Sequence, residues 1–223
     1  LDEILEQPKV IKQILEGCRI DTHGNQDLTL FGCGSSYNAA LLGKYFLQQN
    51  PYWTCKVEYA ANPDLIETDR IYMALSQSGE TKDVLDRAKQ IKHARQILLG
   101  ITKEHSTLAQ LCTEVTSPPF GYENAVAATK SFTAQVASLY KLSNGFNFQL
   151  LKEKYGCDEE LSKLLPKTML LAEQVKKYDN ILFLGKAVTY PVALEAALKF
   201  KEVAYIHAEG MVASEIKHGP LAL

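Results

Sequence analysis

The chain has 223 residues, which is enough for one large domain or two small ones with a sizeable hydrophobic core. Hydrophobic residues make up 46% of it and charged residues 22%, so the composition excludes a disordered chain. The formal net charge is −2 and no apolar run approaches the ~20 residues that cross a bilayer, so we expect no nucleic acid and no membrane as a partner.

The cysteines and histidines form no metal or disulfide pattern. The five cysteines are odd in number and more than ten residues apart, which argues against a disulfide framework and a zinc ribbon. We expect free thiols in a reducing cytoplasm, with Cys33 and Cys112 as small buried side chains. The five histidines have no metal-ligand spacing, so we expect no metal and no cofactor.

Predicted helices and buried strands alternate along the first part of the chain. Apolar residues at helical spacing predict an N-terminal helix over residues 1–17. Short unbroken apolar runs predict strands, at residues 28–33, 56–60, 70–75 and 96–102. Amphipathic segments predict helices, at residues 35–47, 82–93, 106–111 and 126–142. This alternation is typical of an α/β fold with a parallel sheet and helices on both faces.

The second part of the chain repeats part of the first. A polar connector over residues 144–160 precedes a predicted helix at 160–178, a strand at 181–185 and a helix from Pro191. Matching residues recur 153 positions apart, at Gly32 and Gly185, Tyr37 and Tyr190, and Ala40-Leu41 and Ala193-Leu194. The constant offset predicts a duplicated strand–helix unit, which would bind ligands at the carboxyl ends of its strands.

Hydroxyl-bearing turns follow two of the predicted strands. The segment LSQSGET at residues 75–81 places three hydroxyls and Gly79 between a strand and a helix, and Gly34-Ser35-Ser36 repeats this chemistry. Glycine permits positive φ and a helix start offers unpaired N–H groups, so this is a favourable place for an anion. Four side chains would donate hydrogen bonds to phosphate oxygens: Ser76, Gln77, Ser78 and Thr81.

A second interpretation of the same loop stays open. Ser78 or Thr81 caps the following helix, and Ser76 makes a local turn. The loop has no Walker lysine and no GxGxxG, which favours a small sugar phosphate over a nucleotide as its ligand.

The predicted helix at residues 191–205 is apolar around most of its circumference but carries one charged stripe. Glu195, Lys199 and Glu202 lie at i, i+4 and i+7. Charges are rarely buried unless paired or used, so we predict a cleft-lining stripe with Glu202 as a carboxylate base. The alternative is a surface ion pair between Glu195 and Lys199.

Two histidines follow this helix in a polar stretch. His218 precedes Gly219-Pro220, whose rigid turn would hold the imidazole in a fixed direction, so it is the better candidate for proton transfer. His207 is more typical of a solvated loop residue.

Five segments, in collinear order over essentially the whole chain, resemble the isomerase half of the glutamine–fructose-6-phosphate aminotransferase (glucosamine-6-phosphate synthase) family. They are CGSSYN at 33–38, LSQSGET at 75–81, VAATKSFTAQ at 126–135, LEAALKFKEVAYIHAE at 194–209 and SEIKHGPLAL at 214–223. The family is built from sugar isomerase (SIS) domains, so the resemblance implies a three-layer αβα SIS fold. It also implies ketose-to-aldose isomerisation of a hexose phosphate, from fructose-6-phosphate to glucosamine-6-phosphate.

The resemblance assigns roles to matching positions. It implies that Ser35, Ser76, Gln77, Ser78 and Thr81 bind the substrate phosphate and that the backbone around Val126 lines the sugar. Glu202 is implied to move a proton between C2 and C1, with Lys199 beside it. His218 is implied to assist ring opening in the site of the neighbouring subunit of a homodimer.

Some features of the family are changed or lie outside this sequence. The family's VASTK is VAATK here, which replaces a serine by Ala128. The family's glutaminase domain, with its terminal cysteine nucleophile, and its C-terminal tail, with a Schiff-base lysine, have no counterpart here. We therefore expect a glutaminase domain in the full-length protein and do not assign the Schiff-base role to Lys130 or Lys199.

The repeat also predicts the domain organisation. We expect a first SIS domain with its N-terminal helix at residues 1–150, a connector helix at 151–178 and the start of a second SIS domain at 179–223. The offset would close a second copy near residue ~303, so we expect an incomplete second repeat and a longer natural protein.

Two other functions stay open. A stand-alone SIS deaminase or ketosamine-phosphate lyase needs no glutaminase, although HAEGMVASEIKHGPLAL fits the synthase pattern closely. A non-catalytic SIS module that senses sugar phosphates needs the phosphate loop but neither Glu202 nor His218.

Overall fold

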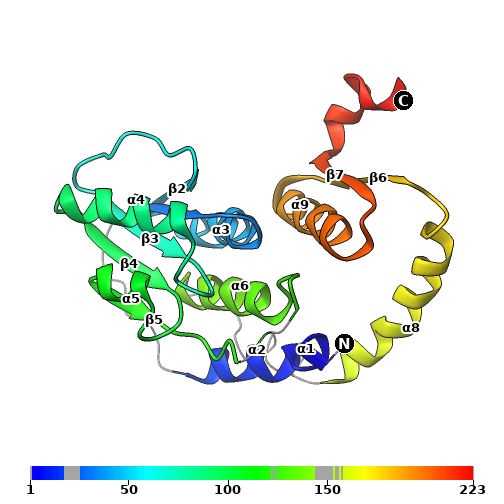
Figure 1. Ribbon diagram of the computed structural model, residues 1–223, viewed down its shortest axis with the longest axis horizontal. Coiled ribbons are helices and arrows are strands. Elements are labelled where there is room, and N and C mark those ends of the chain that lie inside the picture. Colours follow the sequence, from blue (N-terminus) through cyan, green and yellow to red (C-terminus); the bar gives the residue numbers. More distant parts are fainter. Residues whose placement is uncertain are drawn as a thin grey trace.

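The computed structural model describes residues 2–17, 26–121, 123, 125–143, 153, 156 and 158–222. It contains a five-stranded sheet flanked by helices and a smaller unit built on two strands (Figure 1). The α/β fold with a parallel sheet is therefore confirmed. Among the described helices, none combines the length and the apolar character needed to cross a membrane.

The larger sheet is parallel throughout and has the strand order β2-β1-β3-β4-β5. Its strands are β1 (Gln26–Gly32), β2 (Trp53–Tyr59), β3 (Ile71–Leu75), β4 (Ile97–Ile101) and β5 (Glu114–Thr116). The first four occur where the apolar runs predict them. The sequence does not predict β5, because this edge strand has only three residues and no apolar run.

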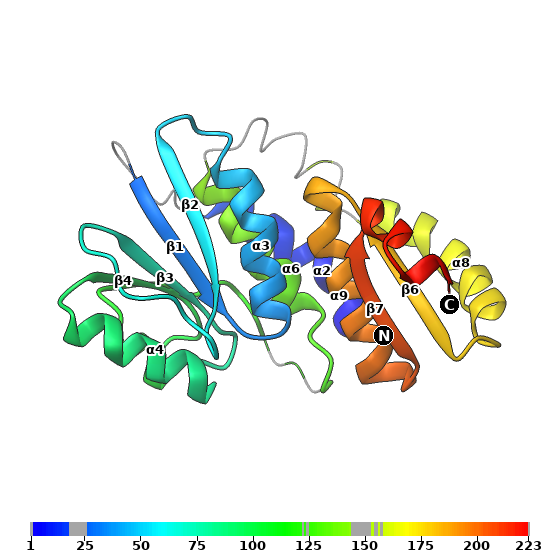
Figure 2. The ribbon, with the colours of Figure 1, turned by 90° about the horizontal axis from the view of Figure 1, so that it is seen from above.

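Side chains on the sheet alternate between two cores. Leu28 and Leu30 of β1 belong to one cluster and Phe31 belongs to the other. The first cluster lies under α2 (Gln7–Glu16), α3 (Ser35–Leu47) and α6 (Lys130–Leu142). The second lies under α4 (Lys82–His93) and α5 (Thr107–Leu111). The sheet is thus the middle of three layers, as Figure 2 shows from above.

Two predicted helices differ from those in the structure. The N-terminal helix divides into α1 (Asp2–Leu5) and α2, and Pro8 in the first turn of α2 explains the break because proline favours a helix start. The helix predicted from Val126 begins only at Lys130. Residues 125–129 form an irregular segment instead, and this segment becomes part of the site described below.

The smaller unit contains α8 (Asp158–Val175), β6 (Asn180–Gly185), α9 (Tyr190–Lys199) and β7 (His207–Val212). The sequence analysis missed β7, because its segment HAEGMV has no apolar run. β6 and β7 are parallel, with Gly185 opposite Val212 as Gly32 is opposite Tyr59 in β1 and β2. Both pairs are 27 residues apart, so the repeat extends through the second strand and its register.

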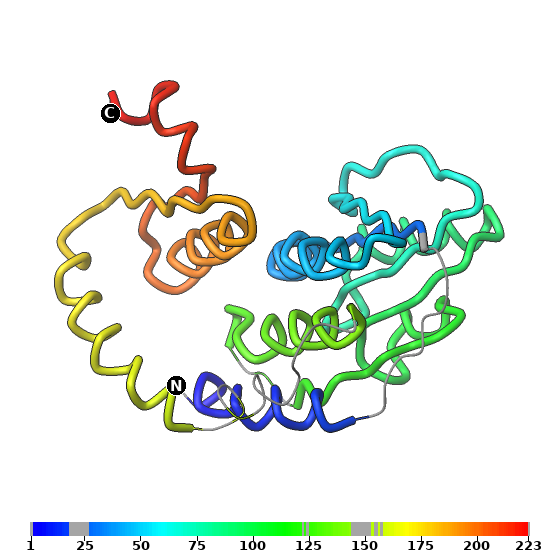
Figure 3. The backbone as a smooth tube through the Cα atoms, turned by 180° about the vertical axis from the view of Figure 1, so that it is seen from behind, coloured from blue at the N-terminus to red at the C-terminus, as the bar shows by residue number. Residues whose placement is uncertain are grey.

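The two units meet where α3 packs against α9. Figure 3 shows these helices side by side from behind, with the N-terminal helices alongside α6. Each begins after a strand that ends in glycine, and a Cβ on Gly32 or Gly185 would contact the start of the following helix. The glycines therefore permit the close strand-to-helix turn at which a ligand site forms.

Candidate active site

A polar cavity of about 240 Å³ lies at the carboxyl ends of β1 and β3. Its walls come from the turn after β1, the loop after β3, the segment before α6 and the helical turn that follows α9. Seven residues predicted from the sequence line it: Ser35, Ser76, Gln77, Ser78, Thr81, Val126 and Glu202. The fold thus brings the two hydroxyl-bearing turns and the charged stripe to one place.

The loop after β3 folds around its own hydroxyl groups. The Gly79 N–H donates to Ser76 Oγ at 3.1 Å, and Ser76 Oγ lies 3.3 Å from Thr81 Oγ1. Gly79 has a φ of +69°, and a Cβ there would collide with the side chain of Ser106, so only glycine fits. Thr81 occupies the N-cap position of α4 but makes no side-chain capping bond. The capping interpretation is therefore wrong for Thr81.

The same loop provides an anion-binding environment. Ser78 Oγ accepts a hydrogen bond from the N–H of Glu80 at 3.2 Å, and the bond from the Gly79 N–H to Ser76 Oγ bears out the local turn expected at Ser76. The bond to Ser78 uses the hydroxyl as an acceptor and leaves its proton available to donate. α4 starts directly after the loop, and the unpaired N–H groups and positive dipole end of a helix favour an anion there.

The turn after β1 is tied to both neighbouring walls. Ser35 Oγ accepts a hydrogen bond from Lys199 Nζ at 3.1 Å, and Ser36 Oγ accepts one from Gln135 Nε2 at 3.0 Å. Gly34, which precedes these serines, has a φ of +54°. The two hydroxyls therefore connect the first strand–helix unit to α9 and to α6.

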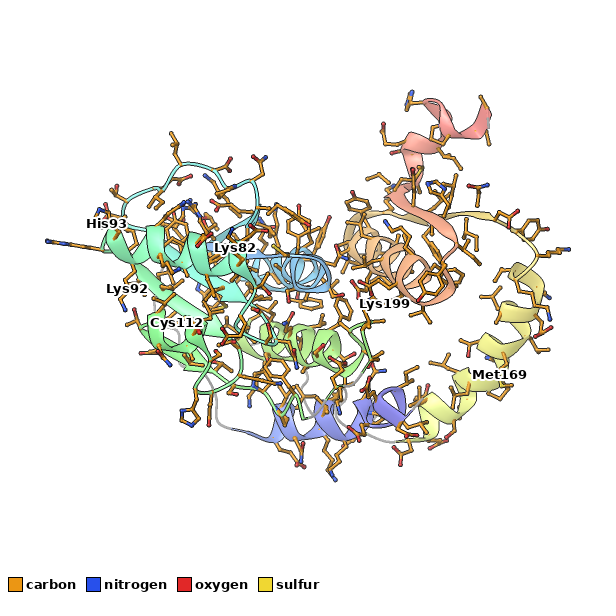
Figure 4. All side chains as sticks on the ribbon, viewed as in Figure 1. Lys82, Lys92, His93, Cys112, Met169 and Lys199 are labelled. Carbon is orange, nitrogen blue, oxygen red and sulfur yellow. The ribbon has the colours of Figure 1, made fainter. Side chains whose placement is uncertain are left out.

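The charged stripe lies between the two units. Lys199 Nζ is 2.6 Å from Glu202 Oε2 and 3.4 Å from Glu195 Oε1. Glu195 is only 7% exposed and accepts a hydrogen bond from Asn38 Nδ2 at 2.8 Å, so the surface-pair interpretation is wrong. Figure 4 labels Lys199 on the side of α9 that faces the first unit. The stripe thus places one ammonium group between two carboxylates at the cavity.

Glu202 lies on a π-helical turn instead of a regular helix. α9 ends at Lys199 and continues as a π-helix from Phe200 to Ala204, which the sequence analysis missed. Tyr205, with a φ of +55°, ends the turn. Such turns are frequent at functional sites because the extra residue re-aims one side chain. The Glu202 side chain is 29% exposed, which suits a carboxylate that meets both solvent and a ligand.

Three polar residues line the cavity that the sequence analysis did not select: Glu123, Ser131 and Gln135. Glu123 Oε1 accepts hydrogen bonds from the N–H of Thr129 at 2.8 Å and from that of Ser131 at 3.4 Å. Burial opposes ionisation of Glu123, but these hydrogen bonds outweigh it and hold the pKa of its carboxyl below the ordinary value. Ser131 and Gln135 lie one turn apart on the buried face of α6, and such polar residues among the apolar ones of a predicted helix are the signal that could have found them.

The histidines and cysteines lie mostly outside this cavity. His218 is exposed and is not among its lining residues, so its role in a neighbouring subunit stays a prediction. His207 is exposed on β7, not in a loop, with Nδ1 2.9 Å from Asn180 Oδ1.

The predicted buried cysteines, Cys33 and Cys112, are only half-buried. Cys33 lines the cavity, and burial raises the pKa of its thiol. Cys18 and Cys157 fall outside the described residues.

No group of three or more histidine, cysteine, aspartate and glutamate side chains in the described part of the chain is arranged to hold a metal ion.

Comparison with known proteins identifies the family. The model of the SIS domain matches residues 24–144 and 174–223, which together make up most of the chain. The chain belongs to the SIS-domain family. The first matched segment of this SIS chain contains the five-stranded sheet and the loop after β3, and the second contains β6, α9 and β7.

The relatives of this SIS chain include aminotransferases. Proteins named glutamine–fructose-6-phosphate aminotransferase (isomerizing) from Nostoc and Acinetobacter baylyi are 33% and 35% identical to it over its whole length. The chain covers 43% of each of these two proteins, so it spans less than half the length of these relatives.

Solved structures show the same architecture. The C-terminal domain of a glucosamine-fructose-6-phosphate aminotransferase from Francisella tularensis aligns with a TM-score of 0.82 and 29% identity, over 99% of this chain and 71% of the other. A glucosamine-6-phosphate deaminase from Thermotoga maritima aligns with a TM-score of 0.82 and 27% identity, over 100% of this chain and 72% of the deaminase.

Proposed function

We propose that this chain is the sugar-phosphate isomerase part of a cytoplasmic glutamine–fructose-6-phosphate aminotransferase. It would convert fructose-6-phosphate to glucosamine-6-phosphate with ammonia from a glutaminase domain of the full-length protein. The observation that carries the proposal is the polar cavity in which the hydroxyls after β1 and β3 meet Glu202, while Lys199 bonds to both Ser35 and Glu202. The similarity to aminotransferases over the whole chain supports it.

One end of the cavity suits a phosphate group. Ser35, Ser76, Ser78 and Thr81 offer hydroxyl donors, and Gln77 offers an amide. No basic side chain lies among the cavity-lining residues, so neutral donors and the start of α4 would carry the recognition of the dianion. Phosphate anchoring fixes the open-chain sugar, and this positioning lowers the entropic barrier to reaction at C1 and C2.

The other end suits a proton transfer. In our proposal Glu202 removes the proton from one of the two carbons and returns it to the other, through an enediol-like intermediate. One carboxylate reaches both carbons because they are adjacent. Lys199, 2.6 Å from Glu202 Oε2, would hold this carboxylate in place and stabilise its ionised form.

Further roles come from the family resemblance. Val126, whose side chain is 94% exposed, would line the sugar through its backbone. His218 would assist ring opening in the site of the second subunit of a homodimer. We further propose the domain organisation given by the repeat, with residues 1–150 as the first SIS domain, 151–178 as a connector and 179–223 as the start of the second.

A second candidate is a sugar-phosphate deaminase that acts without a glutaminase. The alignment to the Thermotoga maritima glucosamine-6-phosphate deaminase, at 27% identity, favours it. Both candidates bind the same class of ligand and use the same cavity. They differ in the fate of the nitrogen, because the aminotransferase adds ammonia to the sugar whereas the deaminase takes up water and releases ammonia. Release of ammonia from glucosamine-6-phosphate by the chain alone would therefore favour the deaminase.

A thermal-shift panel tests the common part of the proposal. We expect glucosamine-6-phosphate and fructose-6-phosphate to raise the unfolding temperature, and unphosphorylated glucosamine and fructose at the same concentration to raise it much less. A ligand at 100 times its dissociation constant stabilises by about 2.7 kcal/mol, which is readily measured. Equal shifts with phosphorylated and free sugars would contradict a phosphate site.

A further inference from the structure

The wall of the cavity before α6 is held from outside by the N-terminal helices. This wall is the irregular segment Ala125–Thr129, whose residues Ala125, Val126 and Ala128 line the cavity. Helices α1 and α2 lie alongside α6 on the outer side of this segment (Figure 1). The contacts between them come from side chains that the proposed reaction does not use.

One of these contacts is a half-exposed ion pair between Glu6 and Lys130. Lys130 is the first residue of α6, and its side chain is only 3% exposed, whereas that of Glu6 is 53% exposed. A buried ammonium group at a helix N-terminus is doubly unfavourable, because it is desolvated and meets the positive end of the helix dipole. Among the described residues, Glu6 is the one carboxylate paired with it. Glu6 therefore stabilises the start of α6 in its observed position.

Two neighbouring side chains extend this contact over the wall. Glu3 Oε1 accepts a hydrogen bond from the N–H of Ala125 at 3.3 Å, and Glu3 Oε2 lies 3.5 Å from Thr129 Oγ1, whose proton is donated to Glu123 Oε1 at 2.9 Å. Gln7 Oε1 accepts a hydrogen bond from Thr133 Oγ1, one turn into α6. Glu3, Glu6 and Gln7 thus contact both ends of the wall and the helix that follows it.

We propose that Glu6, with Glu3, is a positioning residue for the sugar-binding wall of the cavity. The N-terminal helices act as a brace, which fixes the backbone around Val126 through Lys130 and Ala125. The inference rests on the proposed function, because it takes the ligand to be a hexose phosphate. The brace touches the wall and not the loop at residues 76–81, so it should affect recognition of the sugar and leave recognition of the phosphate unchanged.

Calorimetric titration of the 223-residue chain with fructose-6-phosphate and with inorganic phosphate tests this separation. We expect Glu6→Gln to weaken fructose-6-phosphate binding ~5-fold or more, equivalent to about 1 kcal/mol, without changing the affinity for inorganic phosphate. Asp2→Asn is the matched control, because it removes an exposed acid of α1 whose side chain makes no contact with the wall. It should change neither affinity.

A rescue variant separates positioning from simple loss of stability. Adding Lys130→Met to Glu6→Gln removes the unpaired buried charge, and apolar replacement of a buried pair is often neutral. We expect the double variant to regain most of the affinity for fructose-6-phosphate. Unchanged binding in Glu6→Gln would overturn the inference, as would parallel loss of both ligands without rescue.

Hydrogen exchange of the unliganded chain gives a readout that needs no substrate. Glu6→Gln should speed exchange of the amides at residues 125–131 and leave those at residues 76–81 unchanged. Exchange equal to that of the wild-type chain at residues 125–131 would overturn the brace. A wild-type chain that binds no hexose phosphate would refute the proposed function, and the exchange experiment would still decide whether the brace exists.

Discussion

Asn38 and Glu195 are 157 residues apart in the chain, yet Asn38 Nδ2 donates a hydrogen bond to Glu195 Oε2 at 2.8 Å between two buried side chains. Asn38 lies on α3, one turn after Ser35, and Glu195 lies on α9, one turn before Lys199. The bond therefore aligns the face of α3 that carries a predicted phosphate ligand with the face of α9 that carries the charged stripe. Together with the hydrogen bond from Lys199 to Ser35, it fixes the two units relative to each other at the site.

Replacing Asn38 by alanine should destabilise the chain. It leaves a buried carboxylate without its amide donor, and we expect the free energy of unfolding to fall by about 1–3 kcal/mol. Urea denaturation followed by circular dichroism measures this. Gln49→Ala, at an exposed position just after α3, is the control and should lower the free energy of unfolding by less than ~0.5 kcal/mol. Equal effects of the two substitutions would show that the bond contributes nothing.

Replacing Glu202 by glutamine should remove the proton transfer and preserve binding. Loss of a general base lowers the rate by about 100- to 10,000-fold, whereas the amide keeps the shape of the side chain. Incorporation of solvent deuterium at C1 or C2 of bound fructose-6-phosphate, measured by NMR, reports the rate. Glu209→Gln, which changes an exposed carboxylate on β7, is the control. Its rate of deuterium incorporation should equal that of the wild-type chain. Unchanged exchange in Glu202→Gln would contradict its assignment as the base.

Removing two hydroxyls from the loop after β3 should weaken binding of phosphorylated sugars only. A hydrogen bond to a charged group contributes about 1.5–3 kcal/mol, so Ser78→Ala with Thr81→Ala should raise the dissociation constant ~100-fold or more. Binding of unphosphorylated sugar, measured in the same titrations, should not change. Ser162→Ala with Thr168→Ala, two exposed hydroxyls on α8, is the matched control. Equal losses for both kinds of sugar would exclude a phosphate loop.

The pKa of Glu123 gives a prediction for stability at acid pH. Hydrogen bonds from Thr129 and Ser131 outweigh burial and lower the folded-state pKa below the ordinary value of 4.5. A lowered carboxyl pKa stabilises the fold above the unfolded-state pKa, and this stabilisation is lost as pH falls through the folded-state pKa. Between pH 5 and pH 3 we therefore expect the wild-type chain to lose more stability than Glu123→Gln.

Urea denaturation at pH 5, 4 and 3 measures this difference. Glu104→Gln, an exposed carboxylate in the loop before α5, is the control and should follow the wild-type pH dependence. If Glu123→Gln also followed it, the hydrogen bonds to the carboxylate would not contribute to stability.

The sequence alone determined the fold class and most of the candidate site. Unbroken apolar strands and amphipathic helices predict a parallel sheet, and glycine with clustered hydroxyls after a strand predicts an anion site, because these signals are local. Because these signals are local, the sequence alone did not predict β5 and β7. β5 is too short and β7 too polar for an apolar pattern, and only pairing with β4 and β6 makes them strands.

Only the tertiary structure decided how the distant pieces act together. The sequence placed Glu195 in a cleft-lining stripe but left a surface ion pair open, and the structure shows it buried with a hydrogen bond from Asn38 on the other unit. Glu123 and Gln135 join the site because α6 packs over the sheet beside the turn after β1. The contacts of Glu3 and Glu6 with the cavity wall join residues more than 120 positions apart in the chain. A sequence shows which groups are available, whereas packing decides which of them lose water and face one another.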